Sequence, residues 1–335
     1  MSSRPKFVVP LLNMMAEGMT VRKPQLVSVI IPCYNQAHFL VEAIESVRRQ
    51  AYCHVELIVV DDGSSDNTAE VAARYTHVRC IRQENQGLAG ARNTGIRGSA
   101  GDFLVFLDAD DRLLPGALAA GVSGLTARPE CAFIYGSYRH ITVDGLHLST
   151  ERSRCLERDH YLELLRRNFI GMHGAVMYRR AFLEPVNGFD ASLGACEDYD
   201  LYLRIARRFP ITCHGEVVAE YRRHGASMSH NSAVMLKTAL TVLRSQRNYV
   251  KRSNRLKQAL DEGVKVIREF YGEQLVEKVR TRVRARRGWQ QTMQDAFVLL
   301  RYYPQGLVQN AYRKAFTLFT YCVTLCKKSI EPKSL

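Results

Sequence analysis

The stretch "VSVIIPCYNQAHFLVEAIESVRRQAYCHVELIVV", residues 27–60, holds two short apolar runs on either side of a segment with helical periodicity. The runs 27–32 and 55–60 are rich in Val and Ile without polar alternation, which is typical of strands covered on both faces of a parallel sheet. The segment between them is long enough for a crossover helix. This stretch therefore predicts a parallel βαβ unit of an α/β fold.

The alternation of strands and helices continues along the chain. Four strands within about 80 residues predict a Rossmann-like half, with a mostly parallel central sheet. After residue 130 the signal becomes mixed, and 131–145 has the appearance of two short strands. The remaining expected elements are a helix at 67–75, a strand at 77–83, a helix at 88–98, a strand at 102–108, a helix at 157–167, a strand at 174–180, a helix at 197–209 and a strand at 216–224.

The C-terminal third differs in composition from the rest. Residues 1–220 hold 24 Lys and Arg against 26 Asp and Glu, whereas residues 221–335 hold 23 against 7, so the net charge of +14 comes from the tail. From residue 231 the sequence is helical in period and poor in Gly and Pro. We therefore predict an N-terminal extension (1–25), an α/β domain (26–230) and a basic helical region (231–335). The basic region could meet nucleic acid, anionic lipid or an acidic partner.

Cysteine usage and hydropathy bear on the cellular compartment. Nine scattered cysteines without a C-x-x-C pair argue against a disulfide framework and a zinc site, and favour reduced thiols. The longest apolar segment, 315–326, is too short to span a bilayer, and the first 24 residues lack the form of a secretory signal. We expect a cytoplasmic protein.

Polar side chains follow each of the first four predicted strands. The carboxyl ends of parallel strands meet at one edge of a sheet, where doubly wound folds bind their ligands. A ligand pocket is expected there, built from residues that include Tyr34, Asn35, Asp61, Asp62, Arg92, Asp108, Asp110 and Asp111.

The strand "FLVFLDADD", residues 103–111, ends in three acids within four positions. In a crevice these carboxylates would repel one another or take up a proton unless a cation lay among them. Mg²⁺ or Mn²⁺ prefers one or two carboxylates together with phosphate oxygens and water, which favours a metal-bridged diphosphate. A solvated acidic turn is the alternative.

Two further segments carry candidate site residues. The acidic start of the helix "CEDYDLYLR", 196–204, suits either helix capping or a carboxylate base, for which we select Asp198. His224, in "YRRHGASMSH", could complete the coordination of a metal or serve a structural role. His173, upstream, is better explained by core packing than by catalysis.

Five ordered motifs resemble those of the family 2 glycosyltransferases of GT-A fold. They cover about residues 26–230 and read "VSVIIPCYNQAHFL", "LIVVDDGSSDNT", "NQGLAGARNTGI", "FLVFLDADD" and "GFDASLGACEDYDLYLR". The resemblance implies a GT-A domain with a C-terminal helical extension, and an inverting enzyme that moves a hexose or N-acetylhexosamine from a nucleotide-sugar, commonly a UDP-sugar. Its acceptor would be a hydroxyl of a glycan or a lipid-linked molecule, as in the synthesis of surface polysaccharide or glycoconjugates.

The resemblance also implies a role for each motif residue. Pro32, Tyr34 and Asp62 would surround the nucleobase, and Arg92 would lie near the base or the diphosphate. Asp108 and Asp110 would form the D-x-D motif, with Asp108 near the ribose and Asp110 on Mg²⁺ or Mn²⁺. Asp198 would be the catalytic base. His224 would reach the metal or the diphosphate.

Other functions fit the sequence less well. No G-x-G-x-x-G follows the first strand, which disfavours an NAD-dependent dehydrogenase, and no glycine-rich activation loop supports a sugar-nucleotide pyrophosphorylase. A scaffold that binds nucleic acid or membrane through its basic tail, with an idle GT-A domain, is the remaining alternative. It leaves the intact acids unexplained. We expect no nucleic-acid partner, and we consider peripheral contact between the tail and the cytoplasmic face of an anionic membrane.

Overall fold

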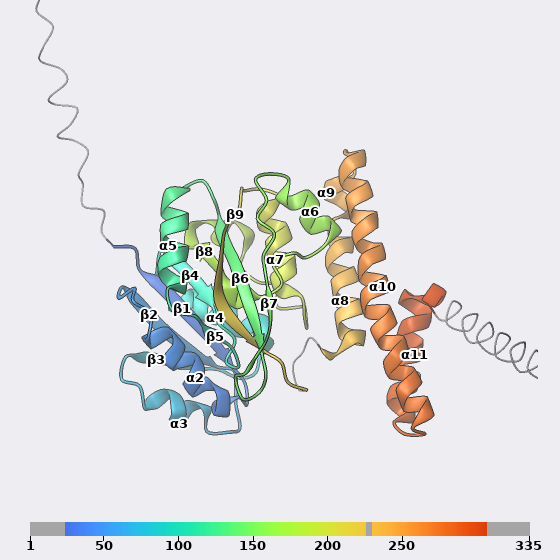
Figure 1. Ribbon diagram of the computed structural model, residues 1–335, viewed down its shortest axis with the longest axis horizontal. Helices are drawn as coiled ribbons and strands as arrows, with labels where there is room; N and C mark the ends of the chain where they lie inside the picture. Colours follow the sequence, from blue (N-terminus) through green and yellow to red (C-terminus); the bar gives the residue numbers. More distant parts are fainter. Residues whose placement is uncertain (1–23, 226–229, 307–335) are drawn as a thin grey trace, which may run out of the picture.

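The structure is a computed structural model that describes residues 24–225 and 230–306. A nine-stranded sheet runs through it in the order β3-β2-β1-β4-β8-β6-β9-β5, with β7 paired to β6 (Figure 1). The strands are β1 (Val27–Cys33), β2 (Val55–Asp61), β3 (Val78–Arg82), β4 (Phe103–Phe106), β5 (Arg112–Leu113), β6 (Phe133–Ile141), β7 (His147–Glu151), β8 (Val176–Arg179) and β9 (Thr212–Arg222).

The first four strands form the parallel half that the sequence predicts. β1 pairs in parallel with β2 and β4, and β2 pairs in parallel with β3. Ile30, in the middle of β1, lies beside Ile58 of β2 and Phe106 of β4. The carboxyl ends of these strands therefore lie at one edge of the sheet, as required for a shared ligand site. The α/β fold class is confirmed.

The second half of the sheet is mixed and differs from the prediction in detail. The segment 131–145 contains one long strand, β6, instead of two short ones, and Gly136 lies within it. A Cβ atom at Gly136 would collide with the ring of His214, so the glycine permits close approach of β9. The short strands β5 and β7 were not predicted. β5 pairs antiparallel with β9, which lies far along the chain, and β7 pairs antiparallel with β6 in a hairpin. Both strands are short and have little apolar signal of their own.

Helices cover both faces of the sheet. The helices are α2 (Ala37–Arg48), α3 (Thr68–Ala73), α4 (Gly87–Gly98), α5 (Ala117–Ala127), α6 (His160–Arg166), α7 (Glu197–Ala206), α8 (Ser232–Ser245), α9 (Arg247–Val250), α10 (Asn254–Arg284) and α11 (Trp289–Tyr302). Alternate residues of β1 enter different cores: Val29 and Ile31 pack with α2, α3 and α5, whereas Ile30 packs with α4, α6 and α7.

The helical C-terminal region packs beside α6 and α7 (Figure 1). Val242 of α8 and Leu260 of α10 belong to the same hydrophobic core as these two helices. Gly263 of α10 allows the closest approach, because a Cβ there would collide with the carbonyl oxygen of Leu165. The division near residue 230 stays a prediction. The described chain places it between the end of β9 and the start of α8.

No helix within the described ranges is long and apolar enough to cross a membrane. Residues 1–23, which make up most of the predicted N-terminal extension, lie outside those ranges. The apolar segment 315–326 lies outside them as well.

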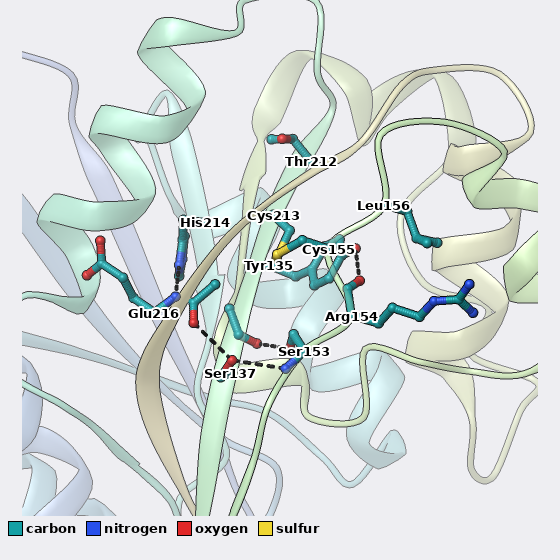
Figure 2. Close-up of a disulfide and its surroundings, with 12 residues drawn as sticks. Tyr135, Ser137, Ser153, Arg154, Cys155, Leu156, Thr212, Cys213, His214 and Glu216 are labelled. Carbon is teal, nitrogen blue, oxygen red and sulfur yellow. Dashed lines mark hydrogen bonds between the residues drawn. A yellow bond between two sulfur atoms is a disulfide. The ribbon is translucent and has the colours of Figure 1, made fainter.

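A disulfide joins Cys155, just after β7, to Cys213 near the start of β9 (Figure 2). The expectation that all the cysteines are reduced is therefore wrong for this pair. A separation of 58 residues gives no sequence signal for pairing, which arises only because β6 brings the two segments together, with Cα atoms 5.2 Å apart. Among the described cysteines the free ones are Cys33, Cys53, Cys80, Cys131 and Cys196.

Candidate active site

A cleft of about 870 Å³ opens at the carboxyl ends of β1, β2 and β4. We call it the donor cleft, from the role that the sequence predicts for it. Four of the predicted residues do not line the cleft: Asp61, Arg92, Asp111 and Asp198. The other seven do: Pro32, Tyr34, Asn35, Asp62, Asp108, Asp110 and His224.

The two adjacent acids at the end of β2 have different surroundings. Asp61 is buried, and its Oδ1 accepts the backbone N–H of Ser64 at 2.9 Å, so it holds the turn. Asp62 lines the donor cleft, and its Oδ1 accepts hydrogen bonds from Gln83 Nε2 at 2.7 Å and from the backbone N–H of Gln86 at 2.9 Å. These bonds fix the carboxylate of Asp62 before any ligand arrives.

The rim beside Tyr34 is held by a second carboxylate. The Oδ2 atom of Asp66 accepts the backbone N–H of Ala37 at the start of α2, at 3.0 Å. Its Oδ1 atom accepts the backbone N–H of Thr68 at the start of α3, at 3.1 Å. Asp66 therefore accepts backbone N–H groups at the starts of two helices, α2 and α3. Tyr34 itself is half exposed at the cleft.

The three acids after β4 have three different partners, which reduces the repulsion expected among them. Asp108 Oδ1 accepts from Arg92 Nη2 at 2.7 Å, and Asp110 Oδ2 lies 2.8 Å from His224 Nε2. Asp111 is buried, and its Oδ1 accepts the backbone N–H of Arg222 at 2.8 Å. Burial and the charges of Asp110 and Asp108 raise the pKa of Asp111 well above the ordinary value. Asp111 therefore serves the fold, by binding the backbone of β9, and does not face the ligand.

The pair Asp110 and His224 is the candidate metal-binding group. Both line the cleft, and burial followed by the charge of Asp108 raises the pKa of Asp110. No group of three or more His, Cys, Asp or Glu side chains suited to a metal occurs among the residues the structure describes. One carboxylate and one imidazole nonetheless fit an ion that takes its other ligands from phosphate and water.

Arg222 is a residue whose role the sequence did not reveal. Its side chain is buried, and Nε donates to the carbonyl oxygen of Asp110 at 2.8 Å while Nη2 donates to Glu42 of α2 at 2.6 Å. The guanidinium also donates to the carbonyl oxygen of Val143. The sequence shows that Arg222 and Arg223 precede His224, but it does not show which residues Arg222 contacts. Arg222 fastens the loop after β4 to β9 and so positions Asp110 opposite His224.

Arg92 lies beneath the cleft and joins the two acidic motifs. It is 1% exposed, and its guanidinium pairs with Asp108 and with Glu197, which the sequence reading did not select. Phe189 lies against it, with the guanidinium carbon 5.5 Å from the ring centre. These contacts favour a positioning role for Arg92. The predicted contact with the nucleotide stays a prediction.

Asp198 lies in the first turn of α7, next to Glu197. Its Oδ1 accepts the backbone N–H of Tyr199 at 2.7 Å. Burial and the charge of Glu197 raise the pKa of Asp198 to about 7, although Arg92 acts in the opposite direction. A carboxylate with a pKa near neutrality is suited to accept a proton at physiological pH.

His173 belongs to the core, as the sequence interpretation favoured. It is buried, with Nε2 2.9 Å from the hydroxyl oxygen of Tyr178 and its ring stacked on Phe106. Burial and the nearby charge of Arg92 lower its pKa well below the ordinary value, which favours the neutral imidazole.

Comparisons with known proteins agree with this architecture. The family model described as "Glycosyl transferase family 2" matches residues 28–186. The UDP-Glc:alpha-D-GlcNAc-diphosphoundecaprenol beta-1,3-glucosyltransferase WfgD of Escherichia coli is 33% identical over 224 residues, which is 65% of this chain and 85% of that protein. Chondroitin synthase of Escherichia coli is 29% identical over 217 residues, which is 64% of this chain and only 31% of that protein.

Solved structures share the fold. TarS 1–349 of S. aureus, in complex with UDP-GlcNAc, superposes with a TM-score of 0.60 at 17% identity and covers 71% of each chain. The mannosyltransferase PcManGT of Pyrobaculum calidifontis, in complex with GDP-Man and Mn²⁺, gives 0.58 at 20% identity, over 93% of this chain and 89% of that one. The fold and its acidic cleft are of GT-A type, and the sequence relatives place the chain among the glycosyltransferases. The chain belongs to glycosyl transferase family 2.

Proposed function

We propose that the protein transfers a sugar from a nucleotide-diphosphate donor, with a UDP-sugar as the first choice, to a hydroxyl group of an acceptor. The observation that carries this proposal is the buried link from Asp108 through Arg92 to Glu197, the neighbour of Asp198. This link connects the acids of the donor cleft to the helix that carries the candidate base, Asp198. The named complexes of TarS with UDP-GlcNAc and PcManGT with GDP-Man support a nucleotide-sugar donor.

Within the donor cleft, Pro32, Tyr34 and Asp62 are proposed to contact the nucleobase, and Asp108 the ribose. Asp110 and His224 would hold Mg²⁺ or Mn²⁺. When bound there, the ion supplies positive charge next to a diphosphate. The PcManGT complex with Mn²⁺ supports this assignment.

Asp198 is proposed as the general base of a single in-line displacement. It takes the proton of the acceptor hydroxyl while that oxygen forms a bond to the anomeric carbon. The bond between the anomeric carbon and the donor phosphate breaks, and the nucleoside diphosphate leaves with the electron pair. The anomeric configuration is inverted, without a covalent sugar intermediate. A hexose or an N-acetylhexosamine suits this scheme.

The donor and the stereochemistry can be tested directly. We expect UDP-sugars with Mn²⁺ to raise the melting temperature more than GDP- or dTDP-sugars do. We also expect proton NMR of the product to show the anomeric configuration opposite to that of the donor. Retention of configuration would contradict the role of Asp198, and the absence of any shift with all three nucleotides would contradict the donor class.

We also propose that the enzyme contacts an anionic membrane that carries its acceptor. Helix α11 has an apolar face that the described residues leave more than half exposed, with four members at helical spacing: Trp289 (55% exposed), Met293 (72%), Phe297 (65%) and Leu300 (62%). Residues 278–306 hold seven Lys and Arg against one acid, so the surroundings of this face are basic. An apolar helix face within a basic surface is complementary to anionic headgroups and the acyl region below them.

A further inference from the structure

A second cleft, of about 840 Å³, lies between the β6–β7 hairpin, α6 and α10. It is nearly as large as the donor cleft, and the two share no lining residue. Glu262, Lys265, Val266 and Glu269 line it from α10 at spacings of three and four residues, which place them on one helix face. This wall belongs to the C-terminal region, outside the residues 28–186 that match the family model.

The two clefts approach each other at a pair of aromatic rings. Tyr221 of β9 lines the donor cleft and Tyr138 of β6 lines the second cleft, with ring centres 6.4 Å apart and edge to face. Helix α10 also carries Tyr271, whose pKa is raised by burial and then by Cys196 and Asp198. The helix that forms the wall of the second cleft thus comes close to the candidate base.

The two clefts differ in charge. Three aspartates and no Lys or Arg line the donor cleft, whereas five Lys and Arg line the second cleft. Two of these five are neutralised, because Arg154 pairs with Glu163 at 3.0 Å and Arg166 pairs with Glu163 and Glu262, each at 2.7 Å.

Three cations in the second cleft are free to meet a ligand. Arg152, Arg167 and Lys265 are exposed and have no ion-pair partner within the described part of the chain. The acids Glu151 and Glu269 also line this cleft and are exposed. The free charge inside is therefore three cations against two acids.

The segment 153–155, which follows Arg152 in the chain, is fixed before a ligand binds (Figure 2). The neighbouring Ser153 donates its backbone N–H to Ser137 Oγ at 2.9 Å, and the hydroxyl of Tyr135 donates to the carbonyl oxygen of Arg154 at 2.8 Å. The disulfide from Cys155 to β9 secures the same segment. A preorganised rim lowers the conformational entropy lost when a ligand binds.

We infer that the second cleft binds the acceptor, and that this acceptor carries a phosphate or diphosphate group. The inference rests on the proposed transferase function. Guanidinium groups bind phosphate oxygens through paired N–H donors, and an ammonium adds a point charge, so Arg152, Arg167 and Lys265 suit such an anion. The acceptor hydroxyl would then extend past the Tyr138–Tyr221 pair toward Asp198.

Inorganic pyrophosphate in EDTA is the probe for this site, measured by calorimetry on the full chain. We expect one site on the wild-type protein, and at least tenfold weaker binding by the triple variant Arg152→Gln, Arg167→Gln, Lys265→Gln. Two controls should bind as the wild type does: Lys237→Gln, an exposed cation on α8, and Asp110→Asn in the donor cleft. Geranyl diphosphate separates the sources of the anion. If geranyl diphosphate binds more tightly than pyrophosphate, the acceptor is a prenyl-linked diphosphate. If the two bind equally, the acceptor is a phosphorylated sugar.

Hydrolysis of UDP-sugar to UDP, with water as acceptor, reports on the donor cleft alone and should be unchanged in the triple variant. Pyrophosphate binding that is absent in the wild type, or equal in the triple variant, overturns the inference even when hydrolysis proceeds. If no nucleotide-sugar is hydrolysed while pyrophosphate binding follows the expected pattern, the transferase proposal fails and the anion site stands. The three side chains are exposed, so their substitution should leave the fold intact, and each single variant should weaken binding by a smaller factor.

Discussion

Arg92 Nη2 lies 2.7 Å from Asp108 Oδ1 although Arg92 is almost fully buried. The same guanidinium pairs with Glu197, so loss of Arg92 leaves two carboxylates without a counter-charge. Removal of one partner from a buried ion pair destabilises a protein by about 3 kcal/mol or more. We therefore expect Arg92→Leu to lower the free energy of unfolding by about 3 kcal/mol, measured in urea. Arg97→Leu, on the exposed face of the same helix, should change it little, and an equal loss in both variants would contradict the role of the link.

Asp110 and His224 should be needed for metal-dependent nucleotide binding. At a hundredfold excess over the dissociation constant, UDP with Mn²⁺ should stabilise the wild-type protein by about 2.7 kcal/mol. Asp110→Asn should abolish this effect and His224→Ala should weaken it, measured as thermal shifts with and without EDTA. Asp144→Asn, an exposed acid in the β6–β7 turn, serves as the control. The metal assignment fails if Asp110→Asn keeps an EDTA-sensitive shift.

Asp198 should set the pH dependence of turnover. Its pKa is raised to about 7, and a base acts when deprotonated, so kcat/KM should fall about tenfold per pH unit below pH 7 and level off above it. Asp198→Asn should reduce kcat on the order of a thousandfold and retain donor binding. Asp200→Asn, on the same helix but paired with Arg204, should keep the pH midpoint. Near-normal turnover of Asp198→Asn would place the base elsewhere.

The raised pKa of Asp198 also has a consequence for stability. A carboxyl group whose folded pKa exceeds its unfolded value favours the folded state at low pH, and this contribution is lost as the pH rises through the folded value, about 7. At pH 8 the negative charge of the partly buried Asp198, next to Glu197, is unfavourable. We expect Asp198→Asn to unfold at a higher urea concentration than the wild type at pH 8, and this gain should be absent at pH 4.

Local patterns were sufficient to predict the parallel half of the sheet and the residues at its strand ends. Periodicity identified β1 to β4, and parallel pairing alone brings Asp62 and Asp110 to one edge. The partners of these residues could not be predicted in the same way. Glu197 lies 105 positions from Arg92, and their contact depends on how α7 packs against α4. The disulfide and the Tyr138–Tyr221 pair likewise depend on tertiary packing, and no local sequence pattern predicts them.

The Cys155–Cys213 disulfide should stabilise the oxidised protein. It closes a loop of 58 residues, for which chain entropy gives about 4 kcal/mol. We expect dithiothreitol, or the variant Cys213→Ser, to lower the free energy of unfolding by about 2 to 4 kcal/mol. Cys53→Ser, an exposed free cysteine, should have no effect. Equal stability with and without reductant would show that the bond does not form in solution.

The apolar face of α11 should direct binding to anionic vesicles. Trp289, Met293, Phe297 and Leu300 are all more than half exposed, and no described residue covers them. We expect the protein to float with vesicles of phosphatidylglycerol and phosphatidylcholine, and to float less as salt rises, because the basic surroundings act through screened charge. Phe297→Ser with Leu300→Ser should reduce the bound fraction at least fivefold.

Leu146→Ser is the matched control, since Leu146 is as exposed as this face but lies in the β6–β7 turn. Hydrolysis of the donor in solution should be the same in all variants, because α11 lines neither cleft. Size-exclusion chromatography distinguishes the other occupants: a wild-type dimer that the double variant dissociates, without flotation, would assign the face to a second copy. Flotation that is equal in the double variant and the wild type would remove α11 from the membrane contact, since only burial of its apolar side chains in lipid predicts a difference.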